Sequence, residues 1–433
     1  MAINPVKGTH DIIADEANTY SGIEYDCRIL AELFGYSEIR TPIIEHTPLF
    51  LRSVGESSDI VTKEMYTFDD KGGRSLTLRP EMTAGVMRSV VSNKLYATND
   101  LPLKYFYIGP CFRYERPQAG RYRQFHQFGV EAIGSTSYLQ DVEVITLGKR
   151  VLDSLGIDKV KVLINSLGDE ESRENYRAAL KEYFSKHIDC MCEDCKRRLE
   201  VNPLRILDCK VPEDRKIIEG APKIHDYLSD VARGHFDNVV DMLKKVGIDV
   251  EIDDTLVRGL DYYTGIVFEY HMNDSDDVGA IGGGGHYKNL LKEVGGPDLE
   301  GVGLSFGIER LYYVYNKVNA GEEMFVNGPD FYLMGMDAHA IELNFALANI
   351  LRMNGYAVEM NYENKSFKSL FKIAEHKHSK FAIIVGEDEI RNGTLTVKNL
   401  NTQEQTTVKT DDMLLVFKSM LEDYMRDLRK EAK

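Results

Sequence analysis

Hydrophobic side chains recur at helical spacing near the N-terminus, where the pattern predicts one helix followed by a strand. The apolar positions of this helix are Ile23, Cys27, Leu30 and Phe34. The pattern stops at Gly35, a residue type that commonly ends helices. The segment SEIRTPIIE that follows has the composition of a strand, and Pro42 inside it favours a sheet edge or an interface over a central position. We therefore expect residues 1–165 to mix helices with aromatic-rich strands.

The pattern changes three times along the chain, which predicts four segments. Residues 166–250 are charged, helical in pattern and rich in cysteine, and we interpret them as an insertion. Residues 251–325 return to strands and glycines. Over residues 329–433 strands and helices alternate, and Asn392-Gly393 is a signal for a hairpin before a further strand. This last segment has the length and alternation of a separate α/β domain.

The charge balance narrows the classes of function. The 433 residues include 53 Lys and Arg against 69 Asp and Glu, a formal net charge of −16, which excludes a protein that coats nucleic acid by bulk electrostatics. Basic residues still gather at 113–123 and 365–380. Each cluster is either a local binding site for a polyanion or an ordinary solvent-exposed face. Without an apolar stretch of about 18 residues or a secretory signal, the chain is expected to be cytoplasmic, with no membrane contact.

Residues 103–134 are the most informative stretch for chemistry. Two aromatic-rich alternating runs are joined by a turn rich in Pro, Gly and Arg, which predicts a long antiparallel hairpin. Alternation places Gln127 and Glu131 on one face with Gly129 between them, so we expect a polar floor with a vacancy. Arg113 lies near the turn. A solvated polar face of an amphipathic strand is the alternative.

Neighbouring strands are expected to add polar groups to this floor. The segment RGLDYYTGIVFEY begins with Arg258 and places Tyr263, Gly265 and Glu269 on one face. A glycine vacancy beside the tyrosine would again leave space for a ligand. The four glycines 282–285 permit close backbone approach, or else form a flexible turn.

The segment GVGLSFGIERL predicts a strand that runs into a helix, with Arg310 in the first turn of that helix. An arginine there is placed to meet a phosphate, because a helix N-terminus already favours anions. An ordinary surface arginine is the alternative. The chain has no G-x-x-x-x-G-K-[ST] motif, and its glycine spacing at 301–307 does not match the dinucleotide fingerprint. P-loop and dinucleotide sites are therefore not expected.

These segments together resemble those of histidyl-tRNA synthetases, which are class II aminoacyl-tRNA synthetases. GYSEIRTPIIEHTPLF resembles their dimerisation motif, FRYERPQAGRYRQFHQFGVE their motif 2, and GVGLSFGIERL their motif 3. TLRPEMT at 77–83 and RGLDYYTGIVFE at 258–269 resemble segments particular to the histidine-specific members. The likeness extends through nearly the whole chain. It implies an α+β class II catalytic domain whose antiparallel sheet is flanked by helices, a helical insertion domain, a C-terminal α/β anticodon-binding domain and a homodimer.

The resemblance also implies an activity: histidine is activated with ATP and Mg²⁺ to histidyl-adenylate and then transferred to the 3′ end of tRNA(His). The residues implied to hold histidine are Glu81, Thr83, Glu131, Tyr263 and Tyr287. Those implied to bind ATP or act on the reacting carboxylate are Arg113, Gln127, Arg258 and Arg310. Arg116 and Gln118 are implied to contact the tRNA acceptor end. No metal ligand is assigned within this catalytic site.

One loop departs from the family pattern. The family commonly has GGGRYD where this chain has GGGHYK at 283–288, so that His286 and Lys288 replace an Arg and an Asp beside Tyr287. A second reading of the chain is a non-catalytic regulatory subunit of ATP phosphoribosyltransferase, which resembles the synthetase core. Such subunits lack the anticodon-binding domain, and their sequence usually departs from the RGLDYYTG segment. This chain keeps both features.

The insertion carries a cysteine cluster of Cys190, Cys192, Cys195 and Cys209. Six cysteines in the whole chain are too few for a disulfide framework. The Cys-x-x-Cys spacing is that of a structural zinc site, which would stabilise a subdomain with little apolar material. Reduced structural thiols are nevertheless the favoured interpretation, and zinc is the alternative, because Cys190 and Cys192 are only two residues apart, which is close for two ligands of one tetrahedral ion.

Overall fold

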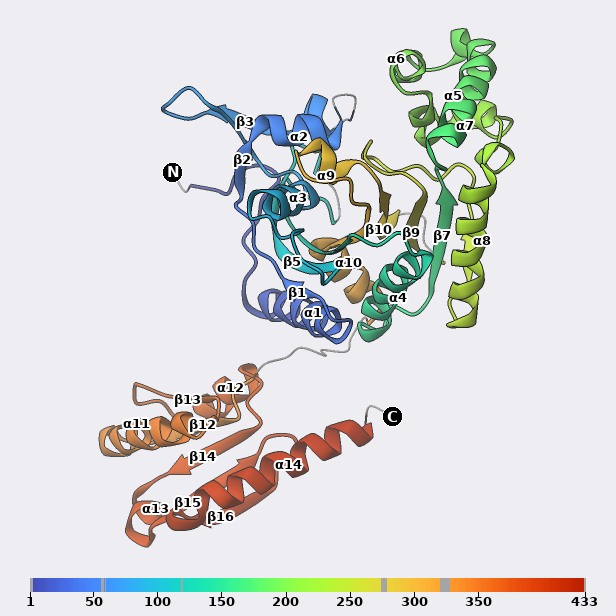
Figure 1. The fold of residues 1–433 in the computed structure, drawn as a ribbon. Helices are drawn as coiled ribbons and strands as arrows, with labels where there is room; N and C mark the ends of the chain where they lie inside the picture. Colours follow the sequence, from blue (N-terminus) through green and yellow to red (C-terminus); the bar gives the residue numbers. More distant parts are fainter. Residues whose placement is uncertain are drawn as a thin grey trace. The chain divides into compact units, whose positions relative to one another are not determined.

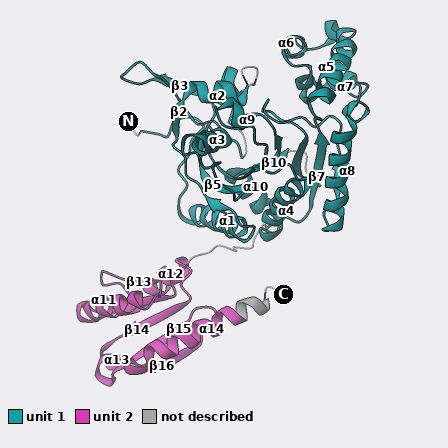
Figure 2. Ribbon diagram, in the orientation of Figure 1, with its two compact units in different colours: residues 1–323 teal, residues 324–433 magenta. Residues whose placement is uncertain are grey.

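The computed structural model describes residues 3–55, 58, 60–117, 120–273, 279–319 and 328–431, with side chains described as far as residue 426. The chain divides into two compact units, Met1–Glu323 and Met324–Lys433 (Figure 2). In the residues described, no helix is both long enough and apolar enough to cross a membrane.

An eight-stranded sheet forms the centre of the first unit (Figure 1). In spatial order its strands are β1 (Ser37–Glu38), β5 (Leu103–Phe112), β6 (Gln124–Ile133), β11 (Gly301–Gly307), β10 (Ala280–Tyr287), β9 (Ile266–Met272), β7 (Val160–Ser166) and β8 (Val250–Ile252). The strands from β5 to β7 pair antiparallel, and only the outer pairs β1–β5 and β7–β8 are parallel. The β5–β6 pair confirms the predicted hairpin, with Gly109 opposite Gln127 and Tyr105 opposite Glu131.

Helices cover both faces of this sheet. On one face pack α1 (Ala14–Leu33), α4 (Tyr138–Ser154) and α10 (Ile308–Val318). On the other, α3 (Thr83–Ser92) and α9 (Leu290–Glu293) share a core with Tyr107 and Tyr287. The alternation along β5 explains this sorting, since Phe106 lies against Arg28 of α1 while its neighbour Tyr107 lies on the α3 side. As predicted, α1 ends just before Gly35, whose φ is +81°.

The segment SEIRTPIIE does not form the single strand that its composition predicts. It is split into β1 and β2 (Ile44–His46), which belong to different sheets, and Pro42 lies between them. The second sheet has the order β2, β4 (Ser75–Leu78), β3 (Tyr66–Asp69), next to α2 (Thr47–Val54) and the single turn η1 (Ile60–Glu64). The split follows from proline, which lacks the N–H that a continuous ladder needs. Both pieces lie at sheet edges, as expected.

The insertion is helical, as predicted. It contains α5 (Glu170–Ser185), η2 (Ile188–Cys190), α6 (Glu193–Val201), η3 (Pro203–Asp208), α7 (Pro212–Ile218), η4 (Ile224–Tyr227) and α8 (Asp230–Lys245). The segment before α8 has its own apolar core, which includes Phe184, Leu199, Ile206 and Cys209.

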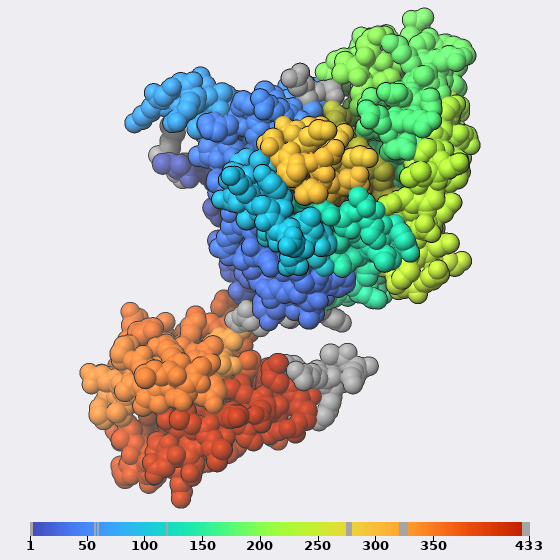
Figure 3. Space-filling model, in the orientation of Figure 1, coloured from blue at the N-terminus to red at the C-terminus, as the bar shows by residue number. Residues whose placement is uncertain are grey.

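Segments far apart in the sequence also meet elsewhere in the first unit. In Figure 3, the yellow-orange residues around α9 lie against the blue residues of α2 and α3.

The second unit is an α/β domain with a five-stranded sheet in the order β13 (Val358–Met360), β12 (Phe331–Gly335), β14 (Phe381–Val385), β15 (Thr394–Asn399) and β16 (Gln405–Lys409). Its helices are α11 (Ala338–Met353), α12 (Phe367–His376), α13 (Glu387–Asn392) and α14 (Met413–Glu431), with the turn η5 (Thr410–Asp412). The expected hairpin at Asn392-Gly393 is wrong. Asn392 ends α13, and Gly393 has a φ of +61° as the residue after that helix.

The four glycines 282–285 are part of β10 rather than a flexible turn. A Cβ on Gly284 would lie 1.9 Å from the carbonyl oxygen of Gly303 in β11, and a Cβ on Gly283 would lie 2.4 Å from the carbonyl oxygen of Phe268 in β9. Only glycine permits these approaches. The close backbone approach that the sequence suggested is therefore what these residues provide.

Candidate active site

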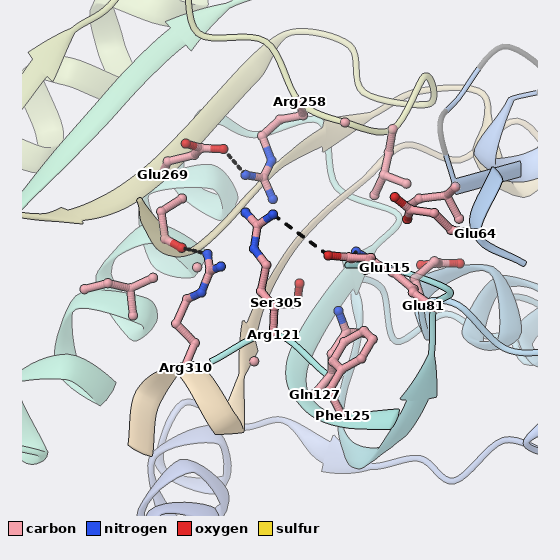
Figure 4. A pocket seen from close by; sticks show the side chains of 18 of the residues that line it. Glu64, Glu81, Glu115, Arg121, Phe125, Gln127, Arg258, Glu269, Ser305 and Arg310 are labelled. Atoms are coloured by element: carbon pink, nitrogen blue, oxygen red, sulfur yellow. Dashed lines mark hydrogen bonds and ion pairs between the residues drawn. The ribbon is translucent and has the colours of Figure 1, made fainter. Parts of the chain in front are cut away.

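A cavity of about 400 Å³ opens on the α3 side of the main sheet (Figure 4). Its lining comes from segments far apart in the sequence: the hairpin β5–β6, the start of α3, the loop at 258–262, the strands β10 and β11, the start of α10, and the insertion. Of the residues predicted for the site, those that line the cavity are Glu81, Thr83, Arg113, Gln127, Arg258 and Arg310.

Beneath this lining, the buried carboxylate of Glu131 accepts three hydrogen bonds. The donors are the Thr83 hydroxyl at 2.7 Å, the Tyr107 hydroxyl at 3.0 Å and the Tyr287 hydroxyl at 2.7 Å. Burial raises the pKa of Glu131 to about 7, and these hydrogen bonds oppose the rise. The group therefore joins α3, β5 and β10 to β6, and it is an acceptor at the base of the cavity.

The vacancy expected over Gly129 is filled. A Cβ on Gly129 would lie 2.4 Å from the Tyr107 hydroxyl oxygen, so the tyrosine ring occupies the space that the missing side chain leaves. In the same way, a Cβ on Gly303 would lie 2.1 Å from a carboxylate oxygen of Glu131. The glycines thus let polar side chains of neighbouring strands lie flat on the sheet, and do not themselves leave the space for a ligand.

Glu81 fixes the start of α3. Its carboxylate accepts from the backbone N–H groups of Thr83 at 2.8 Å and Ala84 at 2.9 Å. Burial raises the pKa of Glu81, and the backbone hydrogen bonds act against that rise. A carboxylate at a helix N-terminus is also stabilised by the helix dipole. Glu81 and Thr83 are therefore held rigidly at the wall of the cavity.

Arginines gather in the other part of the cavity. Figure 4 shows the guanidinium groups of Arg121, Arg258 and Arg310 close together, with Glu115 and Glu269 on either side. Arg310 donates to the backbone oxygen of Ala280, and Arg121 lies 3.9 Å from Glu115. Burial, together with the nearby positive charge of Arg121, lowers the pKa of Arg310 to about 10. Mutual repulsion of this kind favours a bound anion.

Arg258 is largely buried and is paired with a carboxylate. It lies in the loop before β9, with 17% of its side chain exposed, and it forms an ion pair with Glu269. Burial acts against the charged form of Arg258, while Glu269 favours it, and the net result is a raised pKa. Removing Arg258 alone is costly, because the mostly buried Glu269 would lose its arginine partner and keep its contact with His271 at 2.9 Å.

Gln127 and Arg113 are held by contacts that leave polar atoms for a ligand. The Cys111 thiol donates to Oε1 of Gln127 at 3.3 Å, and the amide nitrogen then points into the cavity (Figure 4). Arg113 donates through Nε to the backbone oxygen of Pro80 at 2.8 Å. Arg113 lines the cavity, and its Nη1 lies 3.8 Å from Glu115.

The other predicted residues are less close to the cavity. Tyr263 and Tyr287 are buried next to the lining, where Tyr262 packs between them with ring centroids 4.5 Å and 6.0 Å away. The shared face expected for Tyr263 and Gly265 is wrong, because both precede β9 and Gly265 has a φ of +67°. Arg116 is exposed and does not line the cavity. Gln118 lies outside the described residues.

The insertion supplies one whole wall of the cavity, which the sequence pattern does not predict. Arg205, Asp208 and Lys210 of the insertion line it, and Arg205 donates to Asp261 at 3.1 Å and to the backbone oxygen of Gly259 at 2.8 Å. No local pattern marks these residues, because charged residues are frequent throughout the insertion. Tyr107 was also missed, although the alternation of YFYIG in β5 already places it on the same side as Gly109 and Cys111.

His286, which replaces the usual arginine, has two carboxylate partners behind the cavity. Its ring nitrogens lie 3.0 Å from Asp141 and 3.1 Å from Glu300, and Lys288 lies 3.3 Å from Glu300. Burial lowers the pKa of His286, but the hydrogen bonds to the carboxylates outweigh burial and raise it to about 9. The substitution therefore keeps a positive charge beside Tyr287.

The cysteine cluster lies outside the cavity, and its composition differs from the expected one. Cys190 is exposed, and Asp214 lies in its place beside Cys192, Cys195 and Cys209. This is the one group of metal-ligating side chains found among the described residues.

The antiparallel sheet with its flanking helices, the motif 2 hairpin and the strand-to-helix motif 3 over a cavity rich in arginine define the catalytic domain of a class II aminoacyl-tRNA synthetase. A family model described as histidyl-tRNA synthetase matches residues 8–311, and one described as anticodon binding domain matches residues 331–420. The chain therefore belongs to the histidyl-tRNA synthetase family, and the fold class expected from the sequence is confirmed.

Individual relatives agree with this assignment. The chain is 44% identical to a histidine–tRNA ligase of Bacillus subtilis (strain 168), over 97% of this chain and 99% of that protein. It is 46% identical to one of Halothermothrix orenii, over 96% and 98%. The crystal structure of apo S. aureus histidyl-tRNA synthetase superimposes with a TM-score of 0.81 at 36% identity and covers 96% of this chain and 100% of that chain. The regulatory-subunit alternative is less well supported by relatives of this kind.

The His286 cluster predicts a pH dependence of stability. A histidine whose pKa is raised from 6.5 to about 9 by folding stabilises the folded state fully below pH 6.5, and this contribution is lost as pH rises through 9. His286→Arg keeps its charge over the whole range. Thermal denaturation at pH 6 to 10 should show the wild type losing on the order of 3 kcal/mol relative to His286→Arg. His339→Arg on the exposed face of α11 is the matched control. Parallel stability profiles for wild type and His286→Arg would contradict the role of this charge.

Proposed function

We propose that this chain is a histidine–tRNA ligase, which forms histidyl-adenylate from histidine and ATP and transfers histidine to the 3′ end of tRNA(His). The observation that carries the proposal is the division of one cavity into a carboxylate-bearing end at Glu81, with Glu131 beneath the lining, and an arginine-bearing end at Arg113, Arg258 and Arg310. The first end suits an amino acid with an imidazole ring, and the second suits a triphosphate.

Histidine would bind between Glu81, Thr83 and the Glu131 cluster. Glu81 and Glu131 supply acceptors, and the hydroxyls of Tyr263 and Tyr287 are the polar atoms of the adjoining aromatic wall. A site that pairs with both imidazole nitrogens rejects an analogue that lacks them by about 10⁴ or more, because the buried groups would be left unpaired. Selection at this step would make a separate editing site unnecessary.

ATP would bind with its phosphates among the arginines. The nucleophile in the first step is the histidine carboxylate, which is already ionised at neutral pH and needs no general base. It forms the bond to the α-phosphorus as pyrophosphate leaves. Catalysis then depends on alignment and on cations placed where negative charge develops. Arg113, Arg258 and Arg310 would supply these cations, with the amide of Gln127 as a further donor.

Mg²⁺ would accompany ATP, since this ion commonly binds through substrate phosphates and one or two carboxylates of the protein. Glu115 and Glu269 border the arginines and are suited to that role (Figure 4). Bound there, Mg²⁺ would neutralise part of the phosphate charge. Any zinc at the cysteine cluster would be structural, because none of its residues lines the cavity.

The tRNA would contact both units. We assign its acceptor end to the motif 2 loop, with the exposed Arg116 and with Gln118 as predicted from the sequence. The anticodon is assigned to the second unit, where Lys365, Lys368, Lys372 and Lys377 are exposed on or beside α12. Because tRNA and ATP are cytoplasmic, we place the protein there.

A homodimer is also part of the proposal. Ile43 and Ile44, next to Pro42 in the segment that resembles the dimerisation motif, are 40% and 48% exposed in the single chain. A second copy would cover them. Ile44→Asp should therefore shift the mass measured by light scattering from two chains toward one, whereas Val231→Asp, at a more exposed site in the insertion, should not. A single-chain mass for the wild type would contradict the homodimer.

Arg258 tests the arginine end of the site. Arg258→Ala should reduce histidine-dependent ATP–pyrophosphate exchange by about 10² or more, by analogy with the loss of one transition-state donor. Arg258→Lys keeps a charge opposite Glu269 but not the planar fork, so it should fold like the wild type and still lose about tenfold. The matched control is Arg150→Ala, which removes an arginine paired with Asp153 on α4. Near-normal exchange by both Arg258 variants would refute the assignment.

The second unit is tested by charge reversal. Lys368→Glu with Lys372→Glu should raise the KM for tRNA about tenfold, because phosphate contacts are lost. For the same reason, the KM for tRNA should rise steeply with salt concentration in the wild type only. Histidine activation should stay unchanged. Lys409→Glu with Lys418→Glu, on β16 and α14, makes the same change of charge elsewhere on the unit and should have a smaller effect.

Deletion of residues 328–433 gives a coarser version of the same test. The truncated chain should retain histidine activation and lose affinity for tRNA, because the two units have separate cores. Unchanged tRNA affinity in the truncated chain would exclude the second unit from tRNA binding.

A further inference from the structure

Four side chains of the insertion converge on one point. Cys192 precedes α6, Cys195 is in its first turn, Cys209 follows η3, and Asp214 is in the first turn of α7. Each offers one ligand atom, and the four atoms all lie within 4.8 Å of one another. Three separate pieces of chain are therefore brought together by groups that are typical metal ligands.

The spacing fits a tetrahedral zinc ion. With Zn–S bonds of about 2.3 Å, tetrahedral geometry places two sulfurs about 3.8 Å apart. The Sγ atoms of Cys192 and Cys209 are 3.8 Å apart. A disulfide would require about 2.05 Å between them. Asp214 Oδ2 lies 3.1 Å from Cys209 Sγ, somewhat closer than two ligands of one ion, so binding would need a small outward movement of the carboxylate.

The cluster is buried, and a buried group of this composition is stabilised by a bound cation. Cys195, Cys209 and Asp214 are 0%, 5% and 1% exposed. The Asp214 carboxylate accepts from the backbone N–H of Cys192, at 3.2 Å to each oxygen, and from the Cys209 thiol. In the part of the chain that the structure describes, no lysine, arginine or histidine forms an ion pair with Asp214. A buried carboxylate without a counter-ion is costly, and a bound divalent ion removes that cost.

We propose that Cys192, Cys195, Cys209 and Asp214 bind one structural zinc ion. Three thiol ligands favour zinc over the hard cations Mg²⁺ and Ca²⁺, which prefer oxygen. On binding, the thiols lose their protons to solvent and no oxidation takes place. Cys190 is exposed and is not a ligand.

The position of the site connects it to the candidate active site. Cys209 lies between Asp208 and Lys210, which both line the cavity. The same η3 segment carries Arg205, which holds the loop of Arg258 through Asp261 and the Gly259 carbonyl. Zinc would therefore fix the wall of the cavity that the insertion supplies. This consequence for activity rests on the proposed function, whereas zinc binding itself does not.

The test uses the full chain, purified without chelators. Metal analysis should find about one zinc per chain in the wild type and in Cys190→Ser, the matched control at an exposed cysteine, and far less in Cys209→Ser and Asp214→Asn. Exchange of zinc for Co²⁺ should give thiolate-to-cobalt charge-transfer absorption, which Cys209→Ser should reduce. Removal of zinc from the wild type should increase the number of thiols that react with a thiol reagent.

Metal content of the wild type decides the proposal even if a variant fails to fold. Less than about 0.2 zinc per chain, with the cluster thiols reacting freely, would overturn it in favour of reduced thiols. Thiols that appear only after reduction would overturn it in favour of a disulfide. If zinc is bound at full occupancy but its removal leaves pyrophosphate exchange unchanged, the zinc site is supported and its coupling to the cavity is refuted. Absence of exchange in the zinc-loaded wild type would instead count against the proposed function.

Discussion

The buried carboxylate of Glu131 is the constraint on which the candidate site depends. It lies in the centre of the main sheet and accepts hydrogen bonds from Thr83, Tyr107 and Tyr287, which come from three other elements. A carboxylate at this depth is costly unless its oxygens are paired. The pairing fixes α3, β5 and β10 relative to β6, and it is possible only because Gly129 and Gly303 leave room for the side chains to lie flat.

The rest of the cavity follows from this arrangement. With its carboxylates fixed at one end, the cavity carries its arginines at the other, where Glu115 pairs with Arg121 and Glu269 pairs with Arg258. Glu81 is fixed by the start of α3, and Arg258, although it lies in a loop, is fixed by its ion pair with Glu269 of β9. A reaction that joins a carboxylate to a phosphate without a general base needs this kind of fixed alignment more than it needs a reactive side chain.

The sequence predicts the parts of the fold that local pattern controls. Alternation along residues 103–134 gives the β5–β6 hairpin, and Gly35 marks the end of α1, because both depend on neighbouring residues. Tertiary packing overrides the pattern elsewhere. Period-2 counting places Gly129 on the polar face but does not reveal that the Tyr107 ring covers it, and Asn392-Gly393 ends a helix instead of turning a hairpin.

The candidate site divides in the same way. Segments that resemble the family supply Glu81, Arg113, Gln127, Arg258 and Arg310, and the structure brings these together. Arg205, Asp208 and Lys210 reach the cavity from about 50 residues before Arg258, and Asp214 replaces Cys190 in the cysteine cluster. Contacts of this kind depend on how the helices of the insertion fold back, which no spacing in the sequence reveals.

The central claim is that one cavity holds histidine and ATP in a reactive alignment. Histidine-dependent exchange of labelled pyrophosphate into ATP by the wild-type chain, in the absence of tRNA, tests it most directly. We expect rapid exchange with histidine and Mg²⁺, and none when histidine is omitted or replaced by an amino acid without an imidazole ring. No exchange with histidine, from a folded and zinc-loaded chain, would contradict the account and favour a regulatory protein.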